Sequence, residues 1–114
     1  MKPNTRWIAR QGDVLLLEVA TIPAEALPHK RPLDRNRVVL AYGEVTGHAH
    51  ALAEGTAVDA YGLSDDAFWL DVKEGGATVT HDEHAAIVIP DRVRYVEVRR
   101  QREYSEAGEH RVAD

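Results

Sequence analysis

The 114-residue chain contains no cysteine, and this absence removes several kinds of site at once. A disulfide scaffold, an iron–sulfur cluster, a zinc site built on thiolates and a cysteine nucleophile are all excluded. Serine is also scarce: Ser64 and Ser105 do not lie in a G-x-S-x-G elbow, and the chain has no P-loop and no G-x-G-x-x-G run. A chain without cysteine fits a reducing compartment, so we expect a cytoplasmic protein.

Long apolar stretches and an excess of positive charge are lacking too. No apolar run reaches the roughly 18 residues that a membrane-spanning helix needs, and residues 1–7 do not have the apolar stretch of a secretory signal. The formal net charge is −5, which disfavours binding to nucleic-acid phosphates. Hydrophobic residues make up 44% of the chain and charged residues 29%, as in globular domains. We therefore expect a soluble, acidic protein with neither a membrane nor a nucleic acid as its partner.

Short apolar or alternating segments recur between glycines and prolines, and no long stretch has the period of an amphipathic helix. This pattern predicts an all-β fold, either a small barrel or a jelly-roll-like sandwich of about seven or eight short strands. The expected strands lie within residues 13–19, 37–42, 48–54, 57–61, 68–73, 77–81, 84–90 and 93–102. We expect a single β domain over residues 1–104 and a polar C-terminal tail at residues 105–114.

The segments between the strands give three more predictions. Residues 1–12 are expected to be an irregular lead-in, and Gly75-Gly76 predicts a hairpin between the strands at 68–73 and 77–81. The loop at 20–36 carries three prolines and the densest basic cluster, so we expect it to be mobile apart from one helical turn at 23–27. This loop and the C-terminal tail are the candidate contact segments for a protein partner.

Histidines gather in two short segments, and they are the main functional signal. His48 and His50 lie two residues apart on an expected strand, so strand alternation places both on one face, together with Glu54. Two neighbouring imidazoles are natural ligands for a first-row divalent metal ion. The run from His81 to His84 puts four more metal-capable side chains at a strand end. The sequence thus predicts a site for zinc, iron or nickel, with these candidate ligands: His48, His50, Glu54, His81 and His84.

The run HAHALAE at residues 48–54 is similar to the first cupin motif, in which a glycine precedes an H-x-H pair and a glutamate follows. Gly43 fills the glycine position, one residue closer to the histidine pair than is usual. This resemblance implies a metal inside a jelly-roll barrel, held by His48, His50 and Glu54, with His81 or His84 as a later histidine. The Pro-x-Gly of the second cupin motif precedes neither of these later histidines.

Two further resemblances concern longer stretches of the chain. The segment QGDVLLLEV, followed by a loop and VVLAYGEVTG, is similar to the opening of co-chaperonin barrels of the GroES type. It implies a non-catalytic structural or interaction module that forms a homo-oligomer. The runs GEVTGHAH and QREY resemble a set of small uncharacterised bacterial proteins, to which we attach no activity.

Two functions from different classes stay open on the sequence alone. The first is a metal-binding β protein; if it is an enzyme, the metal acts as a Lewis acid or activates a water molecule. The second is a homo-oligomeric module, in which His48 and His50 make structural hydrogen bonds or are simply exposed. The sequence does not decide whether the protein is an enzyme.

Overall fold

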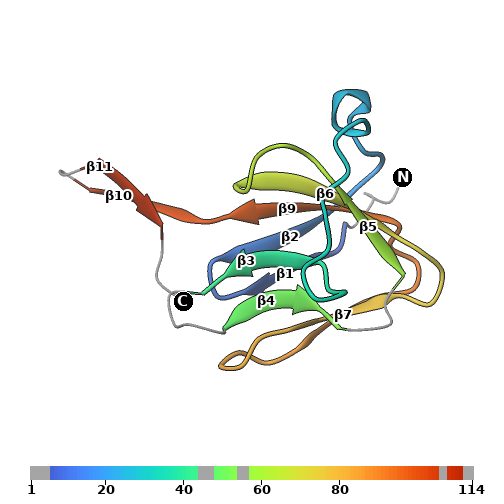
Figure 1. Ribbon diagram of the computed structural model, residues 1–114. Coiled ribbons are helices and arrows are strands. Elements are labelled where there is room, and N and C mark those ends of the chain that lie inside the picture. The colour runs from blue at the N-terminus through green and yellow to red at the C-terminus, as the bar shows by residue number, and fades with distance from the viewer. Residues whose placement is uncertain (1–5, 44–47, 54–56, 106–107, 112–114) are drawn as a thin grey trace, which may run out of the picture.

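A computed structural model shows an open sandwich of two antiparallel sheets, with almost no helix (Figure 1). It describes residues 6–43, 48–53, 57–105 and 108–111. The first sheet has the order β1-β2-β9-β6-β5 and is made of Ile8–Gln11, Val14–Val19, Tyr95–Arg100, Ala67–Val72 and Val58–Tyr61. The second has the order β3-β4-β7-β8 and is made of Val39–Tyr42, Ala49–Leu52, Ala77–Thr80 and Ile87–Ile89. The predicted all-β class is confirmed, as a sandwich and not as a closed barrel.

A separate hairpin follows the sandwich. Strand β10 (Arg102–Ser105) pairs with β11 (Gly108–Arg111), and the two project beyond the end of β9 in Figure 1. The expected C-terminal tail begins at residue 105, so its boundary falls at the end of β10. Among the described residues, no helix is long and apolar enough to cross a membrane.

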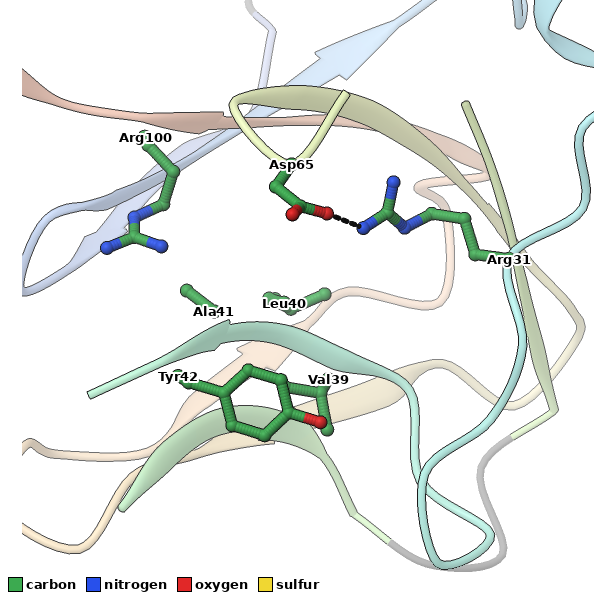
Figure 2. Close-up of a pocket in the computed structure, with 7 residues that line it drawn as sticks. All are labelled: Arg31, Val39, Leu40, Ala41, Tyr42, Asp65 and Arg100. Atoms are coloured by element: carbon green, nitrogen blue, oxygen red, sulfur yellow. Dashed lines mark hydrogen bonds and ion pairs between the residues drawn. The ribbon is translucent and has the colours of Figure 1, made fainter. Parts of the chain in front are cut away.

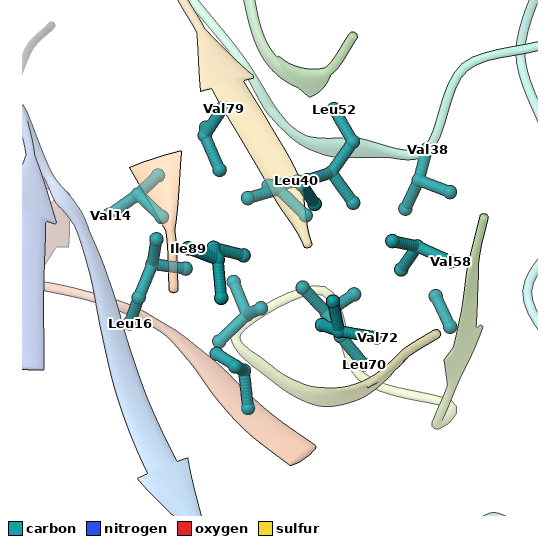
Figure 3. Packing of buried hydrophobic residues seen from close by; sticks show 14 of the residues in the cluster. Val14, Leu16, Val38, Leu40, Leu52, Val58, Leu70, Val72, Val79 and Ile89 are labelled. Carbon is teal, nitrogen blue, oxygen red and sulfur yellow. The ribbon is translucent and has the colours of Figure 1, made fainter. Parts of the chain in front are cut away.

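The core lies between the two sheets because alternate residues of each strand point inward. In β6 the buried positions are Phe68, Leu70 and Val72, and in β9 they are Val96 and Val98. Side chains from the second sheet meet them, as Figure 3 shows for the labelled Leu40, Leu52, Val79 and Ile89. Fully burying one such side chain stabilises the fold by about 1.5–3 kcal/mol.

The Gly75-Gly76 turn does not close a hairpin, so this sequence prediction was wrong. Strand β6 pairs with β5 and β9 in the first sheet, whereas β7 pairs with β4 and β8 in the second. The turn therefore carries the chain from one sheet to the other. Both glycines have positive φ, 103° and 72°, as the sequence predicted. At Gly76 a Cβ atom would lie 2.9 Å from the Ile89 carbonyl oxygen, so glycine is required there for space as well.

Part of the expected N-terminal lead-in is a strand. Residues 8–11 form β1, which pairs with β2 through a two-residue turn, Gly12-Asp13. Gly12 supplies the positive φ, 58°, that the first position of such a turn requires. The turn brings Gln11 and Asp13 into the interior, where both are buried.

The loop at 20–36 contains the expected helical turn, at Ala24–Ala26, but its middle is tied to β5. Arg31 N–H donates to the carbonyl of Ala60, and the Gly62 N–H donates to the carbonyl of His29. The Arg31 guanidinium lies 4.1 Å above the Phe68 ring and donates to the carbonyls of Gly62 and Ser64. The expectation of a mobile loop therefore does not hold for residues 29–31, because these bonds hold them on the sheet.

Candidate metal centre

Three of the predicted histidines come together at one end of the second sheet. In the β4–β7 ladder Ala51 lies opposite Thr80, so one step further places His50 beside His81. The chain then turns towards β8 and brings His84 to the same point. One ligand atom from each of His50, His81 and His84 lies within 4.8 Å of the others. The ring centroid of His81 is 4.3 Å from that of His50 and 4.6 Å from that of His84.

Burial keeps His50 neutral. Its side chain is 0% exposed, and this desolvation, together with the neighbouring His81, lowers its pKa from 6.5 to about 4. A metal ligand must be a neutral imidazole, so at neutral pH His50 is already in the form that binds a metal ion. His81 is 8% exposed, and His84 is half-buried.

The buried amide of Gln11 sets the tautomer of His50. Its Nε2 donates to two backbone carbonyls, those of Val79 at 3.2 Å and Ala85 at 2.9 Å. Its Oε1 therefore faces the Nδ1 of His50, 2.8 Å away, as an acceptor. The proton of His50 lies on Nδ1, and Nε2 carries the lone pair. A hydrogen bond at the nitrogen that does not bind is the usual means of orienting a metal-binding histidine.

His81 makes a different local contact. The backbone N–H of Glu83 donates to its Nδ1 at 3.0 Å, whereas its Nε2 is buried and has no hydrogen-bond partner in the described part of the chain. In the neutral ring this arrangement leaves the proton on Nε2. Metal binding through Nε2 requires that proton to leave and the Glu83 amide to turn away from Nδ1. Glu83 lies in an exposed turn, where such a movement disturbs little packing.

His48 lies beside this cluster and not within it. Its ring centroid is 5.9 Å from that of His81, in an edge-on arrangement. Its Nε2 is 3.4 Å from a carboxylate oxygen of Asp82, and its Nδ1 is 3.3 Å from one of Glu83. The predicted ligand Glu54 lies outside the described residues. The structure thus groups His50 with both later histidines, where the cupin resemblance implies His48, His50, Glu54 and one later histidine.

A protein-family model described as a domain of unknown function, DUF8820, matches residues 10–101. The chain belongs to the DUF8820 family. No curated protein and no solved structure matches it. The matched range of the DUF8820 domain contains all three clustered histidines and also Gln11, and it ends just after β9.

The DUF8820 domain also places a buried ion pair against the histidines, which the sequence did not reveal. Asp13 is 0% exposed, and its Oδ1 lies 3.5 Å from the Nε2 of His50. Its Oδ2 accepts from Arg100, whose Nε is 2.7 Å away and whose Nη2 is 2.5 Å away. Polar residues on either side of a glycine usually mark an exposed turn, so Gln11 and Asp13 carried no signal that they would be buried.

The second feature of this DUF8820 domain is a cavity of about 130 Å³, distinct from the histidines (Figure 2). Its lining comprises Arg31, Val39, Leu40, Ala41, Tyr42, Asp65 and Arg100. Both guanidinium groups are already paired, Arg31 with Asp65 at 2.5 Å and Arg100 with Asp13. The cavity therefore offers no uncompensated charge to a ligand, and we assign it no function.

Proposed function

We propose that this protein binds one first-row divalent metal ion, such as zinc, iron or nickel, through His50, His81 and His84. The observation that carries the proposal is that a ligand atom of each of the three lies within 4.8 Å of the others. Metal–nitrogen distances of about 2.0–2.1 Å would bring such atoms to about 3.3 Å apart, so a small inward movement completes the site. The buried, neutral ring of His50 supports the same conclusion.

Three histidines leave a coordination position for water or a substrate. This arrangement is typical of catalytic metal sites, whereas structural sites are usually closed by four protein ligands. An ion held in this way would act as a Lewis acid or lower the pKa of a bound water molecule. The exposed Asp82 and Glu83, with His48 between them, lie beside the cluster and would supply its acidic surroundings.

The test compares two histidine variants of the tag-free protein, stripped of metal and titrated calorimetrically with Zn²⁺, Ni²⁺ or Fe²⁺. Wild type is expected to bind one equivalent. His84→Ala is expected to weaken binding by more than about 100-fold, the upper end of the loss when only a supporting residue is removed. His84 is half-buried, so its replacement leaves the core intact.

His48→Ala is the matched control, because it removes a neighbouring imidazole that lies outside the cluster. It is expected to bind within a few-fold of wild type. A wild type that takes up no metal refutes the proposal, as does a His84→Ala protein that binds as tightly as wild type.

A second proposal, self-association, is favoured by the strands at the sheet edges. We propose that the protein forms a homo-oligomer through one of them, since β1, β3 and β8 each carry a large exposed apolar side chain: Ile8 (61%), Tyr42 (61%) and Val88 (68%). Light scattering after size exclusion should then give a mass above 12.7 kDa, and Val88→Lys or Ile8→Lys should return it to that value. A wild-type mass of one chain at high concentration would exclude this proposal.

A further inference from the structure

Asp13 lies on the metal-binding side of His50. A carboxylate that only orients a metal-binding histidine accepts a proton from the nitrogen that does not bind the metal. In His50 that nitrogen is Nδ1, and Gln11 already holds it at 2.8 Å. The Oδ1 of Asp13 lies instead 3.5 Å from Nε2, the nitrogen with the lone pair. A cation between a lone pair and a carboxylate oxygen is attracted by both.

The distance between these two atoms also fits a shared ion. A charge-assisted N–H···O hydrogen bond is about 2.7–2.9 Å long, shorter than the 3.5 Å between Nε2 of His50 and Oδ1 of Asp13. Two ligand atoms on a tetrahedral ion, each about 2.0–2.2 Å from it, are about 3.3–3.5 Å apart. The observed separation therefore fits two ligands on one ion.

Arg100 holds the carboxylate of Asp13 in this position. Its own positive charge would repel a metal ion, so the negative charge of Asp13 is needed beside the ion. It binds Oδ2 of Asp13 with two nitrogens, which turns Oδ1 towards the histidine. Both side chains are almost fully shielded from water, with Asp13 at 0% and Arg100 at 8% exposure. An ion held only by neutral imidazoles would place two further positive charges near a buried guanidinium, and the carboxylate offsets that repulsion.

We infer that Asp13 is a fourth ligand of the metal ion, which is then held by three imidazole nitrogens and one carboxylate oxygen. Water or a substrate would bind to this ion as a fifth ligand, since catalytic zinc sites can expand to five-coordinate. This inference rests on the function proposed above. Asp13 lies outside the group of His50, His81 and His84, whose ligand atoms are all within 4.8 Å of one another, and it would reach the ion from the His50 side. A site with three nitrogens and one oxygen suits Zn²⁺, Fe²⁺ or Mn²⁺ and disfavours Cu⁺, which prefers sulfur ligands.

The experiment removes the carboxylate without leaving its partner charge buried alone. Asp13→Asn by itself would leave Arg100 unpaired, so the main variant is Asp13→Asn/Arg100→Gln, a neutral pair of similar size. Its Zn²⁺ affinity is expected to fall by about 100-fold or more, the upper end of the loss seen when only a supporting residue is removed. Arg100→Gln alone loses the group that positions the carboxylate but keeps the carboxylate itself, so it is expected to lose clearly less Zn²⁺ affinity than the double variant. Asp82→Asn, which removes a carboxylate beside His48, is the control and should stay within about three-fold.

Cobalt gives an independent view of the ligand set. Co²⁺ bound to wild type and to the Asp82→Asn variant should give the same visible spectrum, whereas the double variant should give a shifted one. The inference is overturned if the double variant matches wild type in Zn²⁺ affinity and Co²⁺ spectrum. It is also overturned if Arg100→Gln loses as much affinity as the double variant, because the ion pair then acts only as a scaffold. A wild type that binds no metal refutes the three-histidine site itself.

Discussion

Replacing Gln11 by leucine is expected to lower the free energy of unfolding by about 2–4 kcal/mol. The substitution keeps the volume but removes a hydrogen bond from two buried groups, His50 Nδ1 and the carbonyl of Val79, and from the partly buried carbonyl of Ala85. An unsatisfied buried polar group costs about 1–3 kcal/mol, and partial relaxation keeps the sum below three full penalties. Urea denaturation of the metal-free protein measures this loss.

The same variant is expected to weaken metal binding by about 10–100-fold, because the tautomer of His50 is no longer set. Gln101→Leu makes the identical chemical change at an exposed position between β9 and β10 and serves as the control. It should change the free energy of unfolding by less than about 0.5 kcal/mol and leave metal affinity unaltered. If both variants behave alike, Gln11 neither supports the fold nor orients the histidine.

Strands were the part of the fold that local sequence could predict. In β9 the apolar Val96 and Val98 alternate with Glu97 and Arg99, and a two-residue period places both valines on one face of the sheet. The pattern lies within the residues of each strand, so the strand can be predicted without knowing which strands pair with it. A short, mostly apolar run followed by a loop located the strand at 14–19 to within one residue.

The partners of the strands could not be predicted in this way. Two strands joined by Gly75-Gly76 look the same in sequence whether they form a hairpin or cross between sheets. The choice depends on β9, which takes the place beside β6 that β7 would otherwise occupy. A glycine pair reveals the backbone angles of a turn, but not which strands lie beside it.

In the candidate site too, local sequence predicted some of the residues and missed those that depend on distant contacts. Metal-capable residue types at close spacing identified His50, His81 and His84, because their chemistry is visible one residue at a time. Strand alternation also grouped His48 with His50, but His48 precedes the first residue of β4 and turns to Asp82 and Glu83. Gln11 and Asp13 were missed because their burial depends on contacts 39 and 37 residues along the chain, which no local pattern encodes.

The metal-free protein is expected to lose stability as the pH falls from about 6.5 to about 4. The protonation of His50 alone should lower its free energy of unfolding by about 3 kcal/mol over this range. In the folded state burial and the adjacent His81 lower the pKa of His50 to about 4, whereas in the unfolded chain it returns to about 6.5. Above pH 6.5 the residue is neutral in both states, so its contribution is complete. Below that pH His50 becomes protonated in the unfolded chain but stays neutral in the folded protein. This difference favours unfolding until the pH reaches the pKa of His50 in the folded state.

The measurement is a urea denaturation series from pH 7.5 to pH 4, with a chelator present, on wild type and His50→Asn. The asparagine amide can still donate to Gln11 but does not titrate, so its lower overall stability is a constant offset. The difference between the two proteins should stay level above pH 6.5 and then shrink by up to about 1.4 kcal/mol for each pH unit. Parallel curves over the whole range would show that His50 titrates alike in both states, and that the interior does not keep it in its metal-binding form.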